Sequence, residues 1–88
     1  MKWSVEYSKR AVSFIKEYDI EDKVRDSVRD FILKVTGAPV NIDVKKMKGE
    51  WAGCYRIRKG RLRIILKPDS KTRAVFVDIV DFRGSVYR

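Results

Sequence analysis

The chain has 88 residues and a mass of 10.3 kDa, enough for one domain over residues 1–88, and a hydrophobic fraction of 44% that excludes global disorder. The absence of histidine and the presence of one cysteine exclude a Ser-His-Asp triad, every histidine-containing zinc site and an internal disulfide. The formal net charge of +9 favours a polyanion as partner. With no long apolar run and no N-terminal signal region, we expect a cytoplasmic chain without a membrane partner.

The first half of the chain has the pattern of one strand followed by two helices. Residues 2–7 alternate between polar and apolar, which predicts a half-buried strand. Ser8 is then expected to be the N-cap of a helix over residues 9–18. Asp19 is expected to cap a second amphipathic helix, which Gly37 ends.

The second half has the pattern of consecutive antiparallel strands. Residues 54–58 and 61–66 alternate on either side of Lys59 and Gly60, which predicts a hairpin with its two-residue turn there. Residues 73–80 alternate again. The apolar face of this last strand is expected to hold Val75, Val77 and Ile79. The order β-α-α-β-β-β predicts an α+β domain, in which a mostly antiparallel four-stranded sheet is covered on one face by two N-terminal helices.

The positive charge is confined to one half of the chain. Residues 1–44 hold 8 basic and 8 acidic side chains, whereas residues 45–88 hold 13 basic and 4 acidic ones, so the whole excess of +9 lies in the second half. A basic surface concentrated in this way points to nucleic acid more than to an evenly solvated surface.

Arginines alternate with apolar residues across the predicted hairpin. With its turn at Lys59 and Gly60, Arg58 pairs with Arg61 and Arg56 pairs with Arg63 on one face. Like charges directly opposite on a sheet are destabilising, and a phosphate would relieve them through bidentate hydrogen bonds. The alternative is an exposed face kept soluble by its charge, with Asp78 balancing one arginine. We expect phosphate binding.

Other residues could extend such a surface. Lys45, Lys46 and Lys48 precede the hairpin and add positive charge, although alone they would be typical of a solvated loop. Past the last strand, Arg83 adds a further cation, and Tyr87 could stack on a base or donate to a ribose hydroxyl. Spacing alone favours a surface aromatic that packs the C-terminus.

These stretches together resemble a known family. Residues 44–49, residues 55–65, and Arg83 with Val86 and Tyr87 are similar to the RelE/ParE toxin superfamily, and most closely to RelE-like toxins of type II toxin–antitoxin systems. The predicted element order fits as well, so the resemblance covers nearly the whole chain. The central run of a tyrosine, alternating basic residues and a glycine turn is its most specific part.

The resemblance implies a function. RelE-like members are ribosome-dependent endoribonucleases that cleave mRNA in the ribosomal A site, by metal-independent attack of the RNA 2′-hydroxyl, and so inhibit translation. It also implies a cognate acidic RelB-like antitoxin, the ribosome and mRNA as partners, operator DNA through the antitoxin complex, and no cofactor or metal. Two alternatives stay open: a ParE-like inhibitor of DNA gyrase, and a module that binds RNA without cutting it.

The resemblance also implies a set of catalytic residues. They are Arg56, Arg58, Arg63, Arg83 and Tyr87. Lys45, Lys46, Lys48 and Arg61 are expected to bind RNA. The chain departs from well-studied members at Arg56 and Arg58, where these have lysines, and at Phe82, where a histidine is common. A lysine can be pushed toward neutrality and act as a base, whereas an arginine stays protonated.

Each residue of this set has an expected role in cleavage. Arg63 and Arg83 stabilise the phosphate and the leaving group, and Arg56 and Arg58 hold the backbone and favour ionisation of the 2′-hydroxyl. Tyr87 orients the nucleotide. The carboxylates close enough in sequence to act as the base are Glu50, Asp78 and Asp81, and the spacing does not distinguish among them.

Overall fold

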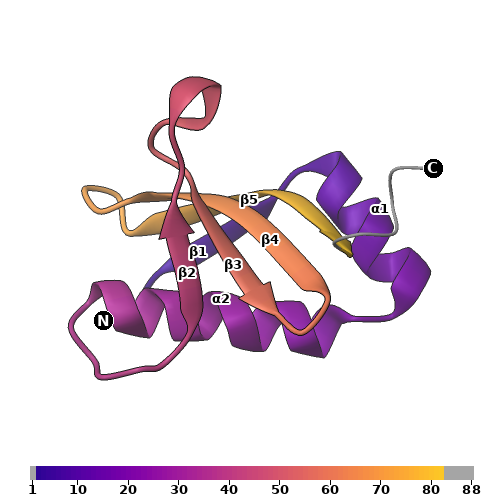
Figure 1. Ribbon diagram of the computed structural model, residues 1–88, viewed down its shortest axis with the longest axis horizontal. Coiled ribbons are helices and arrows are strands. Elements are labelled where there is room, and N and C mark those ends of the chain that lie inside the picture. Colours follow the sequence, from indigo (N-terminus) through magenta and orange to yellow (C-terminus); the bar gives the residue numbers. More distant parts are fainter. Residues whose placement is uncertain (1, 83–88) are drawn as a thin grey trace.

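Two helices and a five-stranded sheet make up the protein in the computed structural model, which describes residues 2–82 (Figure 1). The elements in chain order are β1 (Ser4–Tyr7), α1 (Lys9–Tyr18), α2 (Glu21–Val35), β2 (Asp43–Lys46), the 3-10 turn η1 (Gly49–Trp51), β3 (Tyr55–Lys59), β4 (Leu62–Asp69) and β5 (Ala74–Phe82). The strand order is β1-β5-β4-β3-β2, with β1 parallel to β5 and every other pair antiparallel. The predicted α+β class and the early helices are confirmed.

The prediction of four strands was wrong, because β2 adds a fifth. This strand has one apolar residue within it, Val44, so its sequence lacks a clear alternation. It forms because β3 offers an open edge, on which Val44 lies opposite the buried Ile57. Pairing with β3 therefore determines the secondary structure of this segment, which its own residues do not determine.

The two helices begin and end through different kinds of cap. Ser8 is the N-cap of α1, as predicted, and its Oγ accepts a hydrogen bond from the Ala11 N–H at 3.1 Å. Asp19 does not cap α2. It adopts a left-handed conformation (φ 54°) that ends α1, and Ile20 takes the N-cap position of α2 without a side-chain hydrogen bond. Aspartate tolerates the left-handed region better than most residues, which explains the exchange of roles.

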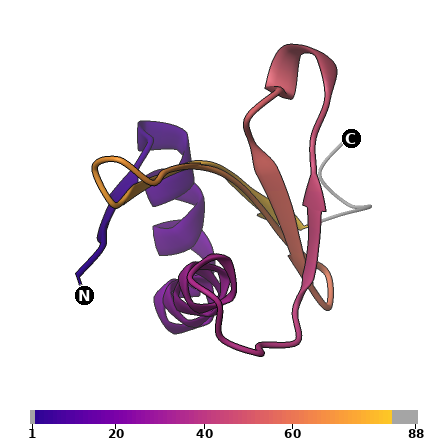
Figure 2. The ribbon, with the colours of Figure 1, turned by 90° about the vertical axis from the view of Figure 1, so that its left-hand side faces the viewer.

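The hydrophobic core lies between the helices and one face of the sheet (Figure 2). Its largest fully buried side chains are Phe31, Ile57, Ile64, Leu66, Val24, Val28, Val75 and Val77. They come from α2 and the three central strands, and Ala11 and Ile15 of α1 belong to the same cluster, so both helices cover the same face. The opposite face, which we call the open face, carries no helix from the described residues. None of the described helices is long and apolar enough to cross a membrane.

The β3–β4 hairpin turns one residue later than predicted. Its loop is Gly60 and Arg61, closed by Lys59 opposite Leu62, and the predicted turn at Lys59 and Gly60 was wrong. Gly60 takes the first loop position with φ +61°, which glycine adopts without steric cost. Since the pairing shifts by two residues, each side chain within β3 and β4 keeps the face predicted for it, but Arg58 pairs with Arg63 instead of Arg61, which lies in the loop.

A β-bulge in β5 reverses the expected face of one residue. Ile65 lies opposite Ile79 and Leu66 opposite Val77, so Asp78 between them has no opposite residue in β4. Ile79 therefore turns to the open face, and Val80 fills the core in its place, at 4% exposure. The prediction that Ile79 shares a face with Val77 was wrong, because strict alternation does not foresee a bulge.

The bulge is held by the start of α1. The Ser8 hydroxyl donates to the carbonyl of Asp78 at 2.6 Å, and Arg10 Nη2 lies 3.0 Å from the Asp78 carboxylate. The predicted balance between Asp78 and an arginine of the hairpin is therefore wrong, because this carboxylate pairs with a helix residue.

Candidate functional site

One row of charged residues crosses the open face through four strands. Asp43 of β2 lies opposite Arg58 of β3, Arg58 lies opposite Arg63 of β4, and Arg63 lies opposite Asp81 of β5. Two like charges therefore face each other in the middle, with one carboxylate at each end. Arg56 occupies the next position of β3 on the same face, opposite Ile65.

Arg63 is held by Asp81. Its Nε donates to Oδ1 at 2.9 Å and its Nη2 to Oδ2 at 2.8 Å, with 22% of the arginine side chain and 15% of the aspartate side chain exposed. Such a bidentate pair fixes the plane of the guanidinium as well as its position. The arginine expected to bind phosphate is therefore oriented by the protein itself.

Arg56 and Arg58 differ from Arg63 in their hydrogen bonding. The Nε–H of each is buried and has no hydrogen-bond partner within residues 2–82, and neither side chain forms an ion pair there. An unsatisfied buried donor costs about 1–3 kcal/mol. The guanidinium fork matches the geometry of phosphate and carboxylate groups, so these two arginines are candidates to bind an anion on the open face.

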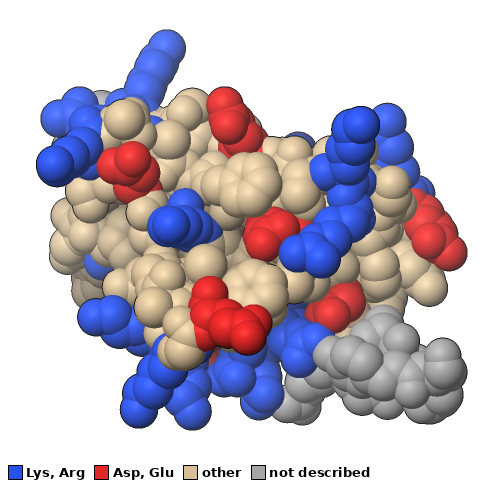
Figure 3. Space-filling view, turned by 90° about the horizontal axis from the view of Figure 1, so that it is seen from above, with Lys and Arg blue, Asp and Glu red and all other residues tan. Residues whose placement is uncertain are grey.

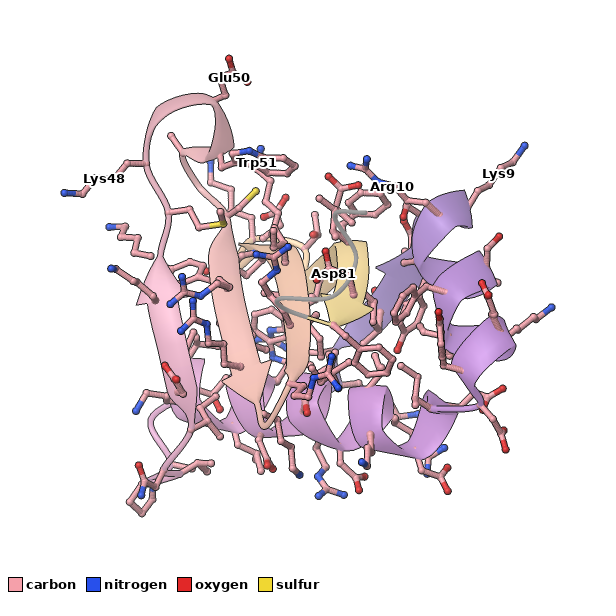
Figure 4. The ribbon with its side chains drawn as sticks, turned by 45° about the vertical axis from the view of Figure 1, so that its right-hand side comes forward. Lys9, Arg10, Lys48, Glu50, Trp51 and Asp81 are labelled. Atoms are coloured by element: carbon pink, nitrogen blue, oxygen red, sulfur yellow. The ribbon has the colours of Figure 1, made fainter. Side chains whose placement is uncertain are left out.

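The structure brings only part of the predicted RNA-binding set to this site. Lys45 lies opposite Arg56 and extends the charged surface to the sheet edge, whereas Lys46 lies opposite Tyr55, whose side chain packs on the core face. Lys48 lies beyond the end of β2 and points away from the sheet (Figure 4). Arg61 is exposed in the β3–β4 turn, so it is not on the open face as predicted.

The three carboxylates considered as bases lie in different places. Glu50 points away from the sheet at the top of Figure 4, and Asp78 is bound to Arg10 at the start of α1. Asp81 alone is in register with the arginines. Its pairing with Arg63 could not be foreseen, because the bulge sets which residue of β5 faces that arginine.

Two aromatic residues near the arginines were missed by the sequence analysis. Trp51 points from the β2–β3 connection toward the side of the molecule on which Asp81 of β5 and Arg10 of α1 lie (Figure 4). Phe76 is 41% exposed in the middle of β5. Its position between two residues predicted to face the core was a signal that it faces solvent, whereas nothing in the sequence indicates where Trp51 points.

Charges of both signs occupy the surface seen from the tip of that connection. Lys and Arg side chains lie on several sides of this view, and acidic side chains lie between them (Figure 3). The positive charge is therefore not distributed uniformly over this surface. The two remaining predicted catalytic residues, Arg83 and Tyr87, lie outside the described residues.

Solved structures of other proteins share this architecture, although comparisons of the sequence alone find no match. No family model and no curated protein matches the sequence. Among solved structures, the archaeal RelE–RelB complex from Pyrococcus horikoshii OT3 contains a chain with 25% identity and a TM-score of 0.65, covering 98% of this chain and 100% of that one.

Two further structures have the same fold. The RelB–RelE antitoxin–toxin complex from Methanococcus jannaschii matches with 24% identity and a TM-score of 0.66, over 93% of this chain and 94% of that one. YafQ from E. coli matches with 12% identity and a TM-score of 0.65, over 99% and 100%. The chain therefore has the fold of the RelE-like toxins in these structures.

Proposed function

We propose that this protein is the toxin of a toxin–antitoxin pair and that it cleaves mRNA in the ribosomal A site. The observation that carries the proposal is the pair of buried Nε–H groups on Arg56 and Arg58 that have no partner within residues 2–82, beside an Arg63 already oriented by Asp81. Three guanidinium groups on one helix-free sheet face form a site for a phosphodiester. The similar structures contain RelE and RelB together, which supports the toxin assignment.

The reaction needs a nucleophile, an in-line geometry and stabilisation of the developing charge. The 2′-oxygen of the RNA bonds to the adjacent phosphorus, the bond from phosphorus to the 5′-oxygen breaks, and the leaving oxygen takes up a proton. Arg63 and Arg83 stabilise the negative charge on the phosphoryl and leaving oxygens. Asp81 keeps Arg63 in the orientation that this requires, so no ordering remains to be done during the reaction.

Loss of the 2′-hydroxyl proton is favoured by the field of the remaining arginines. Arg56 and Arg58 hold the backbone phosphate and stabilise the alkoxide, and the proton passes to solvent water. Neither guanidinium acts as a base, because arginine stays protonated in proteins. Tyr87 orients the ribose of the reacting nucleotide. The site works by positioning and charge stabilisation, and the ribosome supplies the mRNA conformation.

A cognate antitoxin is the expected partner outside the ribosome. The excess of +9 in residues 45–88 favours an acidic RelB-like protein, and covering the open face would neutralise the toxin. Operator DNA is a further expected partner, through the complex with the antitoxin.

The proposal is tested in a translation extract supplied with a defined mRNA. Primer extension after addition of the protein should reveal cuts within translated codons, and these should vanish when initiation is blocked. If the protein arrests translation but the mRNA stays intact, the alternative of a module that binds RNA without cutting it is favoured. Intact mRNA together with loss of gyrase supercoiling activity would establish the ParE-like alternative.

A further inference from the structure

A second group of residues lies on the open face, beyond the arginines. Phe76 of β5 is directly opposite Lys67 of β4, and both side chains point away from the core. Lys67 in turn reaches the β2–β3 connection, since its Cε lies 3.6 Å from the position that a Cβ on Gly53 would take. Trp51 is carried by the same connection, which places the lysine between a strand that bears one aromatic ring and a loop that bears another.

Neither ring belongs to the hydrophobic core, although Trp51 is half-buried. The hydrophobic core and the side chains packed on it include neither Phe76 nor Trp51, and within residues 2–82 no aromatic pair involves them. A phenylalanine that is 41% exposed on a sheet face loses contact with water when a flat ligand covers it.

A groove next to Phe76 has room for such a ligand. It has a volume of about 610 Å³ and lies at the tip of the β4–β5 hairpin. It is lined by the end of β4 with Lys67, by the turn of residues 70–72, by the start of β5 with Phe76, and by Glu6 of β1, whereas Trp51 lies outside it. Pockets that hold small organic ligands span roughly 300–1,000 Å³. The groove therefore accommodates a nucleobase with its sugar.

The position of this group relative to the arginines follows from the strand register. Arg56 lies opposite Ile65, and Lys67 is two residues further along the same face of β4, roughly 7 Å from Ile65 at the usual rise per residue. If Arg56 and Arg58 bind one phosphate of an RNA strand, the neighbouring nucleotide of that RNA thus reaches the aromatic side chains.

We propose that Phe76 and Trp51 form a base-stacking subsite, which binds the nucleotide next to the scissile phosphate while Lys67 neutralises its phosphate. The proposal rests on the function proposed above and adds a contact to the bases. Aromatic rings interleaved with a cation are the arrangement that binds single-stranded nucleic acid, because every base has a π-face. If a protein segment docked here instead, it would require apolar side chains at positions 51 and 76, but these would not have to be aromatic.

That difference defines the variants. Phe76→Leu and Trp51→Leu retain apolar side chains and remove the rings, whereas Phe76→Tyr and Trp51→Phe retain a ring and serve as matched controls. Single-turnover cleavage is measured on programmed ribosomes, with mRNAs that carry one abasic sugar at successive positions beside the cut. Affinity for the antitoxin is measured in parallel.

The subsite predicts that each leucine variant cleaves normal mRNA about 5- to 150-fold more slowly at subsaturating protein, the range for one stacked base, while the aromatic variants stay near wild type. At one position the abasic sugar should slow the wild type by a similar factor but leave a leucine variant almost unaffected, because the same contact is already lost. Antitoxin affinity should not change.

The outcomes separate the two proposals. Normal cleavage by both leucine variants overturns the subsite and leaves the ribonuclease intact. Leucine variants that cleave normally but lose antitoxin affinity identify the groove as a protein-docking surface. A wild type that cuts no mRNA overturns the proposed function, and the subsite falls with it.

Discussion

Asp81 accepts two parallel hydrogen bonds from Arg63, from Nε to Oδ1 at 2.9 Å and from Nη2 to Oδ2 at 2.8 Å. Arg58, directly opposite Arg63 on β3, has no such carboxylate bound to it, and its Nε–H is buried without a partner in the described part of the chain. One arginine of the pair is therefore oriented by a carboxylate of the protein, and the other has no such partner among residues 2–82.

The first prediction concerns Asp81→Asn, which keeps the shape of the side chain and removes its charge. RNA affinity should rise, because a negative charge next to the arginines is lost, while the cleavage rate at saturation should fall about tenfold or more, because Arg63 loses its fixed orientation. The free energy of unfolding should fall by about 1–3 kcal/mol, the usual loss for a hydrogen-bonded charged group.

Binding and single-turnover kinetics on programmed ribosomes separate these effects. A purely structural role for Asp81 would lower affinity and rate together. If Asp81→Asn left the saturated rate unchanged, the orienting role assigned to Asp81 would be wrong.

The second prediction concerns lysine at the positions of Arg56 and Arg58. If these arginines act through their field alone, Arg56→Lys and Arg58→Lys should cleave within a few-fold of wild type, since the charge is kept. A rate that rises with pH in the lysine variants, and not in the wild type, would instead show that a neutral lysine takes the proton. The pH profile of the saturated cleavage rate distinguishes the two.

The third prediction concerns the antitoxin. Because the net charge of +9 comes entirely from residues 45–88, association with an acidic partner should slow markedly between low salt and physiological salt. Stopped-flow association rates at several ionic strengths provide the measurement. A rate independent of salt would contradict electrostatic attraction as the basis of recognition.

The fourth prediction concerns Tyr7. Burial raises the pKa of its phenol above the ordinary value of 10.0, and the charge of Arg25 offsets part of this effect. The unfolded chain then ionises first, so the stability due to Tyr7 is complete below pH 10 and is lost as the pH rises through the folded-state pKa. As the pH rises above 10, the free energy of unfolding from urea titrations should therefore fall less for Tyr7→Phe than for the wild type. An equal fall for both proteins would contradict the prediction.

Several features of the fold were predictable from local patterns. The α1 N-cap at Ser8 and the faces of β3 and β4 follow from residue types and from alternation, which a two-residue change of register preserves. The strand β2 was not predictable, because its pairing with β3 determines it and its own alternation does not. The cap role of Asp19 was misassigned, since aspartate suits both a helix N-cap and a left-handed C-cap.

The candidate site was predictable to a similar extent. Arg56, Arg58 and Arg63 lie together on the open face because they alternate with core residues. Which arginine meets which partner depends on the turn at Gly60 and on the bulge at Asp78, and both are set by backbone geometry. The pairing of Asp81 with Arg63 follows from that geometry, and for this reason the sequence did not reveal it.

The central claim is that the arginines of the open face cleave mRNA on the ribosome. Its most direct test is the single-turnover cleavage rate on programmed ribosomes for Arg58→Ala and Arg63→Ala, with Arg61→Ala in the exposed turn as a control of equal charge. Loss of one charge-stabilising donor typically lowers the rate about 10²- to 10³-fold, and we expect losses of this size for Arg58→Ala and Arg63→Ala with little change for Arg61→Ala. Equal rates for all three folded variants and the wild type would contradict the claim.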